Sequence, residues 1–254
     1  ARLTSAGGDS VPDIKNPRQS VRQQRKQLDF IQSLNRAQKP NEDTANVEGV
    51  IQSYELAFRM QGAMPELMDL SAEDSKTIAM YGADGGPTQS FGRQCLLARR
   101  FAEAGVRFIE VTHGNWDQHV RLTADHKARA EGCDQPIAAL LTDLKQRDLL
   151  KDTLVIWGGE FGRTPTAQNG DGRNHNNKGY TLWMAGGGVK GGHSYGSTDE
   201  HGFEAVENKC HVHDWHATVL HLLGLDHTRL TYRYAGRDFR LTDVYGDVVT
   251  DIIA

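Results

Sequence analysis

The chain has 254 residues, of which 38% are hydrophobic and 24% charged, and its formal net charge is −4. This length allows a substantial core in one or two domains, and this composition excludes a disordered chain. No apolar run approaches the roughly 20 residues that cross a bilayer, so we expect no transmembrane segment. The mildly acidic balance gives no electrostatic footprint for a nucleic-acid partner.

The N-terminal third of the chain is predicted to be helical. Residues 1–16 are rich in turn formers and are expected to be an extended lead-in. The spacing of apolar residues predicts helices over about 17–38 and 43–61. Ser71 followed three residues later by Asp74 predicts the capped start of a third, short helix.

The pattern changes after Gly85-Gly86-Pro87. We therefore divide the chain into a helical segment, residues 1–84, that packs on the core, and an α/β part, residues 85–254. Apolar strands separated by helices favour an α/β fold with a mostly parallel sheet between helices. The expected strands are 106–112, 153–157 and 180–185, and the expected helices are about 88–104, 120–147 and 214–223.

Polar side chains gather where the predicted strands end. In open α/β sheets, binding sites form beyond the carboxyl ends of the strands. Carboxylates and imidazoles there can converge on one divalent ion, because Zn and Mn accept both ligand types. Asp117 and His119 are two residues apart in an extended segment, so their side chains point to the same side. The candidates after the first two strands are Asp117, His119, Glu160, Arg163, Arg173 and His175.

A structural role is the alternative for each of these residues. The chain has 11 histidines, so an Asp-x-His pair is unremarkable by chance. Glu160 and Arg163 can form a loop salt bridge. Asp171 and Asn174 can be turn residues.

Two further patterns favour structural roles. Residues 186–191 match G-x-G-x-x-G after a predicted strand, but a turn-rich stretch follows instead of the helix that a dinucleotide site needs. We interpret them as a glycine-rich loop. In the histidine-rich stretch 210–216, capping and packing are the expected roles, and only His213 stays as an outside metal candidate.

Several long motifs occur in one order along the chain, at residues 116–119, 157–165, 172–175, 185–192 and 196–202. They resemble the hallmark motifs of an exported bacterial family, domain of unknown function 1501, which is similar to alkaline phosphatases and sulfatases. The resemblance extends from about residue 10 to the C-terminus.

The resemblance implies an alkaline-phosphatase-like core, incomplete at its N-terminus in this chain. In catalytic relatives the N-terminal portion supplies the first strand, a metal-binding Asp and the Ser/Thr nucleophile. Thr88 and Ser90 imitate such a nucleophile superficially, but they precede an amphipathic helix, so a cap role is expected. Phe161 stands where a ligand histidine is usual. The resemblance also implies export and a periplasmic setting.

Two hypotheses follow. In the first, the chain is a metal-dependent hydrolase of phosphate or sulfate esters. Asp117, His119 and His175 bind one divalent ion (Zn, Mn or Mg), and Glu160 is a ligand of the same or a neighbouring ion. A small anionic ester is the partner, and Arg163 and Arg173 contact its anionic group. In the second, the chain is a non-catalytic exported binding or structural module that retains the fold and one metal, as Phe161 suggests.

Overall fold

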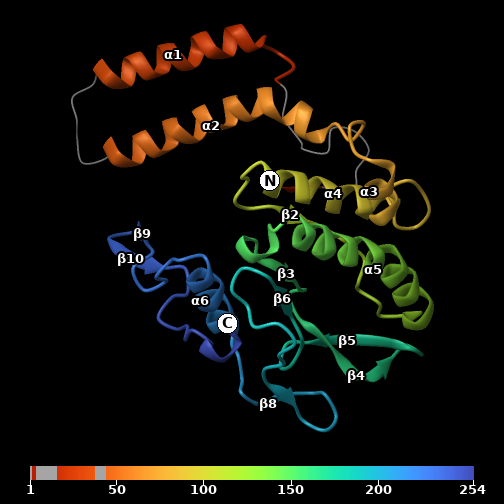
Figure 1. Cartoon of the computed structure of the whole chain (residues 1–254). Coiled ribbons are helices and arrows are strands. Elements are labelled where there is room, and N and C mark those ends of the chain that lie inside the picture. The colour runs from red at the N-terminus through yellow and green to blue at the C-terminus, as the bar shows by residue number, and fades with distance from the viewer. Residues whose placement is uncertain (1, 4–15, 38–43) are drawn as a thin grey trace. The chain divides into compact units, whose positions relative to one another are not determined.

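Helices and short two-stranded sheets make up the computed structural model, which describes residues 2–3, 16–37 and 44–254 (Figure 1). The chain forms two compact units, residues 1–84 with 89–112, and residues 85–88 with 113–254. The predicted boundary after residue 84 is also a boundary of the first unit. However, residues 89–112, which contain the next helix and strand, belong to the first unit and not to the second. The predicted lead-in lies almost entirely outside the described residues.

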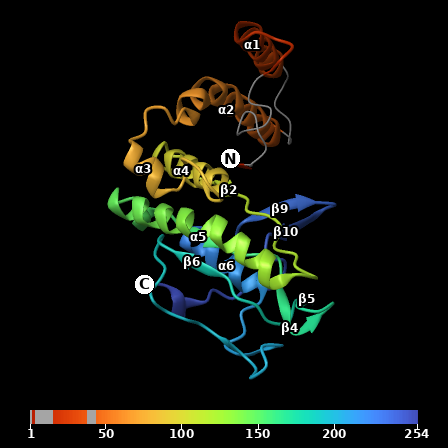
Figure 2. The ribbon, with the colours of Figure 1, turned by 90° about the vertical axis from the view of Figure 1, so that its right-hand side faces the viewer.

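The first unit is mainly helical, and the three helices predicted before residue 84 and the helix predicted over 88–104 are present. In Figures 1 and 2, helix α1 runs beside α2, and Arg25 of α1 forms an ion pair with Glu55 of α2 at 2.6 Å. β1 pairs with β2 in parallel. The elements are β1 (Arg2–Leu3), α1 (Val21–Ala37), α2 (Thr44–Met68), α3 (Ser75–Met80), α4 (Gln89–Glu103) and β2 (Glu110–Val111).

The capped start of α3 differs from the prediction. Asp74, not Ser71, is the N-cap residue, and its carboxylate accepts a hydrogen bond from the Lys76 amide at 3.2 Å. Ser71 lies in the preceding turn, where its own amide donates to Asp69. An ionised carboxylate directly before the helix satisfies an otherwise unpaired amide, so the helix begins there.

The strand predicted over 106–112 is reduced to β2. Gly105 ends α4 in a left-handed conformation with φ of 81°, and the Val106 amide donates to Phe101 O at 2.9 Å. This bond closes the helix end in the pattern that glycine commonly allows. Val106 is therefore tied to the helix and cannot begin a strand.

A buried ion-pair cluster lies in the first unit. Glu73 accepts hydrogen bonds from Arg99 at 2.7 Å and from Arg100 at 2.6 Å, and the Arg99 side chain is only 2% exposed. Burial raises the pKa of the Glu73 carboxyl, but the two arginines outweigh it and hold that pKa below its ordinary value. Arg99 also pairs with Glu103, whose side chain is 44% exposed.

The second unit contains the remaining elements, and the helices predicted over 120–147 and 214–223 are present. The hairpins β4–β5, β7–β8 and β9–β10 were not predicted. The elements are α5 (Leu122–Gln146), the 3₁₀ turn η1 (Leu150–Asp152), β3 (Val155–Trp157), β4 (Gly162–Gln168), β5 (Gly172–Asn176), β6 (Trp183–Ala185), β7 (Ser197–Thr198), β8 (Ala205–Glu207), α6 (Val212–Leu222), β9 (Thr231–Tyr234), β10 (Arg237–Arg240) and the 3₁₀ turn η2 (Thr250–Ile252).

The predicted strands 153–157 and 180–185 are present in shorter form as β3 and β6, and they pair antiparallel, with Trp157 opposite Trp183. A parallel pair needs a long crossover, usually a helix. The β4–β5 hairpin connects β3 to β6 instead, so the chain returns in the opposite direction. Among the described residues, only β1 and β2 pair in parallel. The wider alkaline-phosphatase-like sheet stays a prediction.

The glycine-rich loop after β6 packs backbone against backbone. A Cβ added at Gly186 would lie 2.3 Å from Leu150 O and 2.4 Å from Thr153 O. The Gly187 amide donates to Leu150 O at 3.0 Å. These glycines allow the loop to pack closely against η1, which agrees with the interpretation of residues 186–191 as a structural loop.

Replacing Glu73 with Ala is expected to destabilise the protein by about 3–5 kcal/mol, because the buried Arg99 would lose the buried carboxylate that it shares with Arg100. The matched control is Glu103→Ala, which removes the exposed partner of the same arginine and should cost less than about 1 kcal/mol. Urea unfolding monitored by circular dichroism measures both. Equal losses for the two variants would contradict the assignment of Glu73 as the buried anchor.

Candidate metal centre

The loop between β2 and α5 carries two of the predicted metal ligands. Trp116 anchors it, with its indole NH donating to His113 Nδ1 at 3.0 Å and its ring meeting the Trp157 ring edge-on at 6.2 Å. The next residues bring Asp117 and His119 to the same side, as predicted. Asp117 Oδ1 lies 3.0 Å from His119 Nε2.

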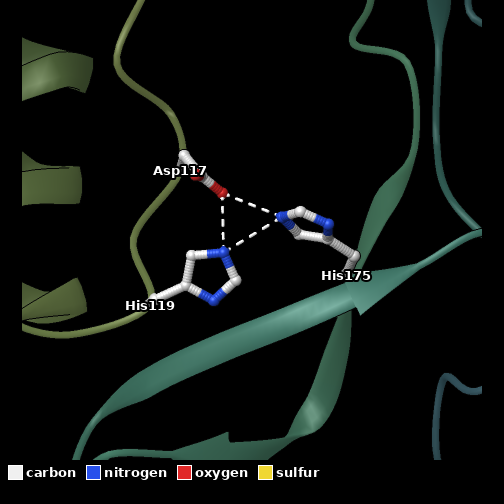
Figure 3. Close-up of side chains that lie close together, drawn as sticks. All are labelled: Asp117, His119 and His175. Carbon is white, nitrogen blue, oxygen red and sulfur yellow. Dashed lines mark hydrogen bonds and ion pairs between the residues drawn. The ribbon is translucent and has the colours of Figure 1, made fainter.

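His175 reaches the same place from β5 (Figure 3). Its Nε2 atom lies 3.0 Å from Asp117 Oδ1 and 3.0 Å from His119 Nε2, so the three donor atoms form a nearly equilateral triangle. In the described part of the chain, no other His, Cys, Asp or Glu joins this group. Two imidazoles and one carboxylate are a donor set that suits a divalent transition metal.

The β4–β5 hairpin positions His175. Its turn contains Asn169 and Gly170 with φ of 50° and 92°, and Asn-Gly is a strong sequence signal for a hairpin because both residues tolerate positive φ. Cross-strand pairing sets Arg163 opposite His175 and Gln168 opposite Gly172. The hairpin therefore presents an arginine, a glutamine and a histidine to the loop.

Hairpin and loop meet backbone to backbone at Gly172. A Cβ added to this buried glycine would lie 2.0 Å from His119 O, much closer than any carbon–oxygen contact allows. The adjacent Arg173 amide donates to Gln118 O at 3.0 Å. The absence of a side chain at position 172 thus allows His119 to approach His175.

Gln168 orients one of the imidazoles. Its Oε1 atom lies 2.8 Å from His119 Nδ1. An amide oxygen only accepts, so Nδ1 carries the proton and Nε2 presents its lone pair to the triangle. Metal-binding histidines are commonly oriented by such a partner on the other ring nitrogen. Gln168 was not predicted as a site residue, because the Asn169-Gly170 signal that follows it indicates a hairpin but not which loop the hairpin faces.

Arg163 is the fourth side chain of the cluster and contacts its carboxylate. Its Nη2 atom donates to Asp117 Oδ1 at 2.6 Å and to Trp116 O at 3.2 Å. Its buried Nη1 atom makes no hydrogen bond within the described residues. Hydrogen bonds from His175 and from Arg163 lower the pKa of Asp117 to about 2, so this carboxylate is ionised at neutral pH.

Phe161 and Glu160 lie on the stretch between β3 and β4. The Phe161 ring packs on the His175 ring with centroids 4.2 Å apart, and the Arg163 guanidinium lies 5.7 Å from the Phe161 centroid. Glu160 is exposed, and its carboxylate is not among the three converging groups. The structure therefore brings together three of the four predicted ligands.

The remaining candidates have structural contacts. Arg173 Nη1 donates to Asp171 O at 2.8 Å and to Gly172 O at 2.9 Å, so this guanidinium is bound to the hairpin turn. His213 lies in the first turn of α6 and stacks on Tyr245 with centroids 5.3 Å apart. His213 is not part of the converging group.

Residues 192–196 read Gly-His-Ser-Tyr-Gly, so Ser194 stands at the serine of the nucleophile pattern G-x-S-x-G. That pattern is catalytic where the serine lies on a sharp turn from a strand into a helix. Ser194 lies instead on an exposed irregular stretch, and the short strand β7 follows. Its surroundings give no support for a nucleophile.

Asp171 ties the hairpin to the start of α5. Its Oδ2 atom accepts a hydrogen bond from the Thr123 amide at 3.0 Å, in the first turn of the helix, where amides lack partners. The bond from the Thr123 amide is the main cause that lowers the pKa of Asp171 below its ordinary value of 3.8. The carboxylate thus acts as a helix cap supplied from another element.

Asp171→Ala is expected to lower the urea midpoint at neutral pH. Because the folded-state pKa is below the unfolded value, this stabilisation is present above pH about 4 and is lost as the pH falls through the folded-state pKa. Urea titrations of both proteins at several pH values measure the difference. Asp171→Asn, which keeps an oxygen acceptor, should lie between them. A difference as large in strong acid as at pH 7 would contradict a role for the charged carboxylate.

Comparisons with known proteins agree with the sequence motifs at the level of the family. Searches of curated proteins and of solved structures found no match. In the described residues, no helix combines the length and apolar character needed to cross a membrane. The sequence model of one family, described as "Protein of unknown function (DUF1501)", matches residues 2–253. The chain belongs to this family.

Proposed function

We propose that the protein is a metal-dependent hydrolase of phosphate or sulfate esters that binds one divalent ion through Asp117, His119 and His175. The observation that carries this proposal is the convergence of these donors, with Gln168 holding His119 in the tautomer that a metal ligand needs. Catalytic zinc sites likewise use three protein ligands and keep a position open for water or substrate.

The donor set fits hydrolytic chemistry. A bound divalent ion polarises an ester oxygen and lowers the pKa of bound water. The chain's own residues hold the ion and orient the substrate. The ionised Asp117 supplies the single negative charge among the three donors, and the two imidazoles are neutral when they coordinate.

Arg163 is the residue that we assign to the anionic group of the ester. It lies beside the donor triangle, where its Nη2 atom donates to Asp117 Oδ1 at 2.6 Å, and its side chain is 25% exposed. A guanidinium presents a planar fork of donors that matches phosphate and sulfate oxygens. Arg173, whose guanidinium is bound to the hairpin turn, fits this role less well.

A second candidate is a non-catalytic binding or structural module that keeps one ion. Phe161 favours it, because an apolar ring packs directly on His175 and provides no donor for a neighbouring ion. The same ring shields one side of the His175 imidazole from water. The two candidates share the ion site and differ in turnover.

The first experiment measures metal content of the full chain by mass spectrometry. We expect near-stoichiometric Zn, Mn or Mg in the parent protein and its loss in Asp117→Ala and His175→Ala. His193→Ala, which removes an exposed histidine outside the cluster, is the matched control and should keep the ion. Turnover of aryl phosphate and aryl sulfate esters is then followed with and without the ion.

Each outcome decides one point. Ion-dependent turnover that is lost in both site variants supports the hydrolase. A stoichiometric ion without turnover of either ester class sinks the hydrolase and leaves the binding module. A folded parent chain that holds no ion contradicts both.

Gln168→Ala is expected to weaken ion binding by about 10- to 100-fold, because His119 would lose the partner that orients its ring. Gln146→Ala, a change at an exposed position in α5, is the control and should leave the affinity unchanged. Isothermal titration with Zn measures both variants. Unchanged affinity in Gln168→Ala would show that the Gln168–His119 contact does not support the ion.

A further inference from the structure

We infer that Asn169, at the tip of the β4–β5 hairpin, is a site of spontaneous covalent modification, where the folded chain deamidates through a cyclic imide formed with the Gly170 amide. This reaction needs neither an ion nor an ester substrate, so the inference goes beyond the proposed function. It concerns how long the hairpin that presents Gln168 and His175 keeps its covalent structure.

The sequence and the exposure of the hairpin tip carry the inference. The Asn-Gly pair occurs once in the chain, at Asn169 and Gly170, and both residues are exposed. The attacking group is the amide nitrogen of the following residue, and a glycine there has no Cβ to hinder the attack. A Cβ added at Gly170 would meet no atom within 4 Å, so the space around this amide is open.

The Asn169 side chain is available for the reaction. Within the described residues, no hydrogen bond or ion pair holds it. The imide forms only after the turn changes its backbone angles, and exposed loop tips are regions where local opening costs little free energy. Only the pairs Ala167–Arg173 and Gln168–Gly172 separate the turn from a register irregularity in the hairpin, so few cross-strand contacts resist this opening.

The reaction consumes water and releases ammonia. The Gly170 nitrogen bonds to Asn169 Cγ, the Cγ–Nδ2 bond breaks, and the Gly170 amide proton leaves with the Nδ2 amino group as ammonia. Water then opens the imide ring at one of its two carbonyl carbons. Attack at Cγ gives aspartate. Attack at the backbone carbonyl carbon gives isoaspartate, whose main chain runs through Cγ and is longer by one carbon.

Two comparable residues of the second unit lack this combination of features. Asp171 also precedes a glycine, but its carboxylate accepts a hydrogen bond from the first turn of α5 at 3.0 Å, and Gly172 is buried. Asn208 is exposed and has φ of 45°, but Lys209 follows it. The lysine side chain crowds the attacking nitrogen, so Asn208 is a matched control within the same chain.

Isoaspartate at the tip would disturb the residue that orients His119. Gln168 directly precedes the tip, pairs with Gly172 across the hairpin, and places its Oε1 atom 2.8 Å from His119 Nδ1. An additional backbone carbon in the turn changes this cross-strand register. This consequence rests on the proposed ion. We expect the ion affinity to fall by about 10- to 100-fold, as when a metal-binding histidine loses its orienting partner.

The test is peptide mass spectrometry of the full chain after incubation at mildly alkaline pH, which favours attack by the amide nitrogen. Trypsin releases residues 164–173 and residues 191–209, each with one asparagine, Asn169 or Asn208. We expect progressive conversion of the first peptide to its aspartate and isoaspartate forms, located at position 169 by fragmentation. The second peptide should stay intact. Asn169→Gly keeps a turn that tolerates positive φ, and its peptide should not change.

The folded state decides the assignment. Conversion of Asn169 in the chain unfolded by guanidinium chloride, but not in the folded chain, would overturn the inference. Equal conversion of Asn169 and Asn208 would overturn it as well, because the following glycine would then have no effect.

Zn titration of the parent before and after incubation measures the consequence for the ion. Asn169→Gly, incubated in parallel, should keep its affinity. Asn169→Asp adds the charge without lengthening the main chain and should keep it too. Unchanged affinity of the converted parent would contradict the link to Gln168. A fresh parent that binds no Zn contradicts the proposed function, whereas mass spectrometry still decides the conversion of Asn169.

Discussion

One carboxylate oxygen organises the polar cluster of the second unit. Asp117 Oδ1 lies 3.0 Å from a nitrogen of each imidazole and accepts a hydrogen bond from Arg163 at 2.6 Å. Without this acceptor, a guanidinium and two imidazoles would face one another, and protonation of either ring would bring like charges together. The low pKa of Asp117, about 2, reflects this environment. The loop, the hairpin and the arginine therefore share one electrostatic centre.

The sequence predicted the elements whose signals are local. Apolar periodicity located the helices, and apolar runs located β3 and β6. It did not predict the hairpins, because β4 reads Gly-Arg-Thr-Pro-Thr-Ala-Gln and lacks the alternation of a half-buried strand. The pairing direction of β3 and β6 was also out of reach, since it depends on the hairpin that connects them.

The donor residues of the candidate site could be predicted from the sequence, but the residues that position them could not. Asp117, His119 and His175 were expected together because they follow strands, and Arg163 was expected nearby. The role of Gln168 could not be predicted, because it depends on a hairpin register that sets this residue opposite Gly172. Arg173 was assigned to substrate from its charge alone, and its carbonyl contacts are visible only once the turn is formed.

The residue at position 172 indicates whether a related sequence can form this site. Because a side chain there would collide with the His119 backbone, a relative that carries the Asp-x-His pair but has a larger residue at this position must arrange its loop differently. The presence of the three donors in a sequence is therefore not sufficient to infer the site. Gly172 has no side chain to bind an ion. It nevertheless distinguishes relatives that can bring the three donors together from relatives that only have the same three residues in their sequence.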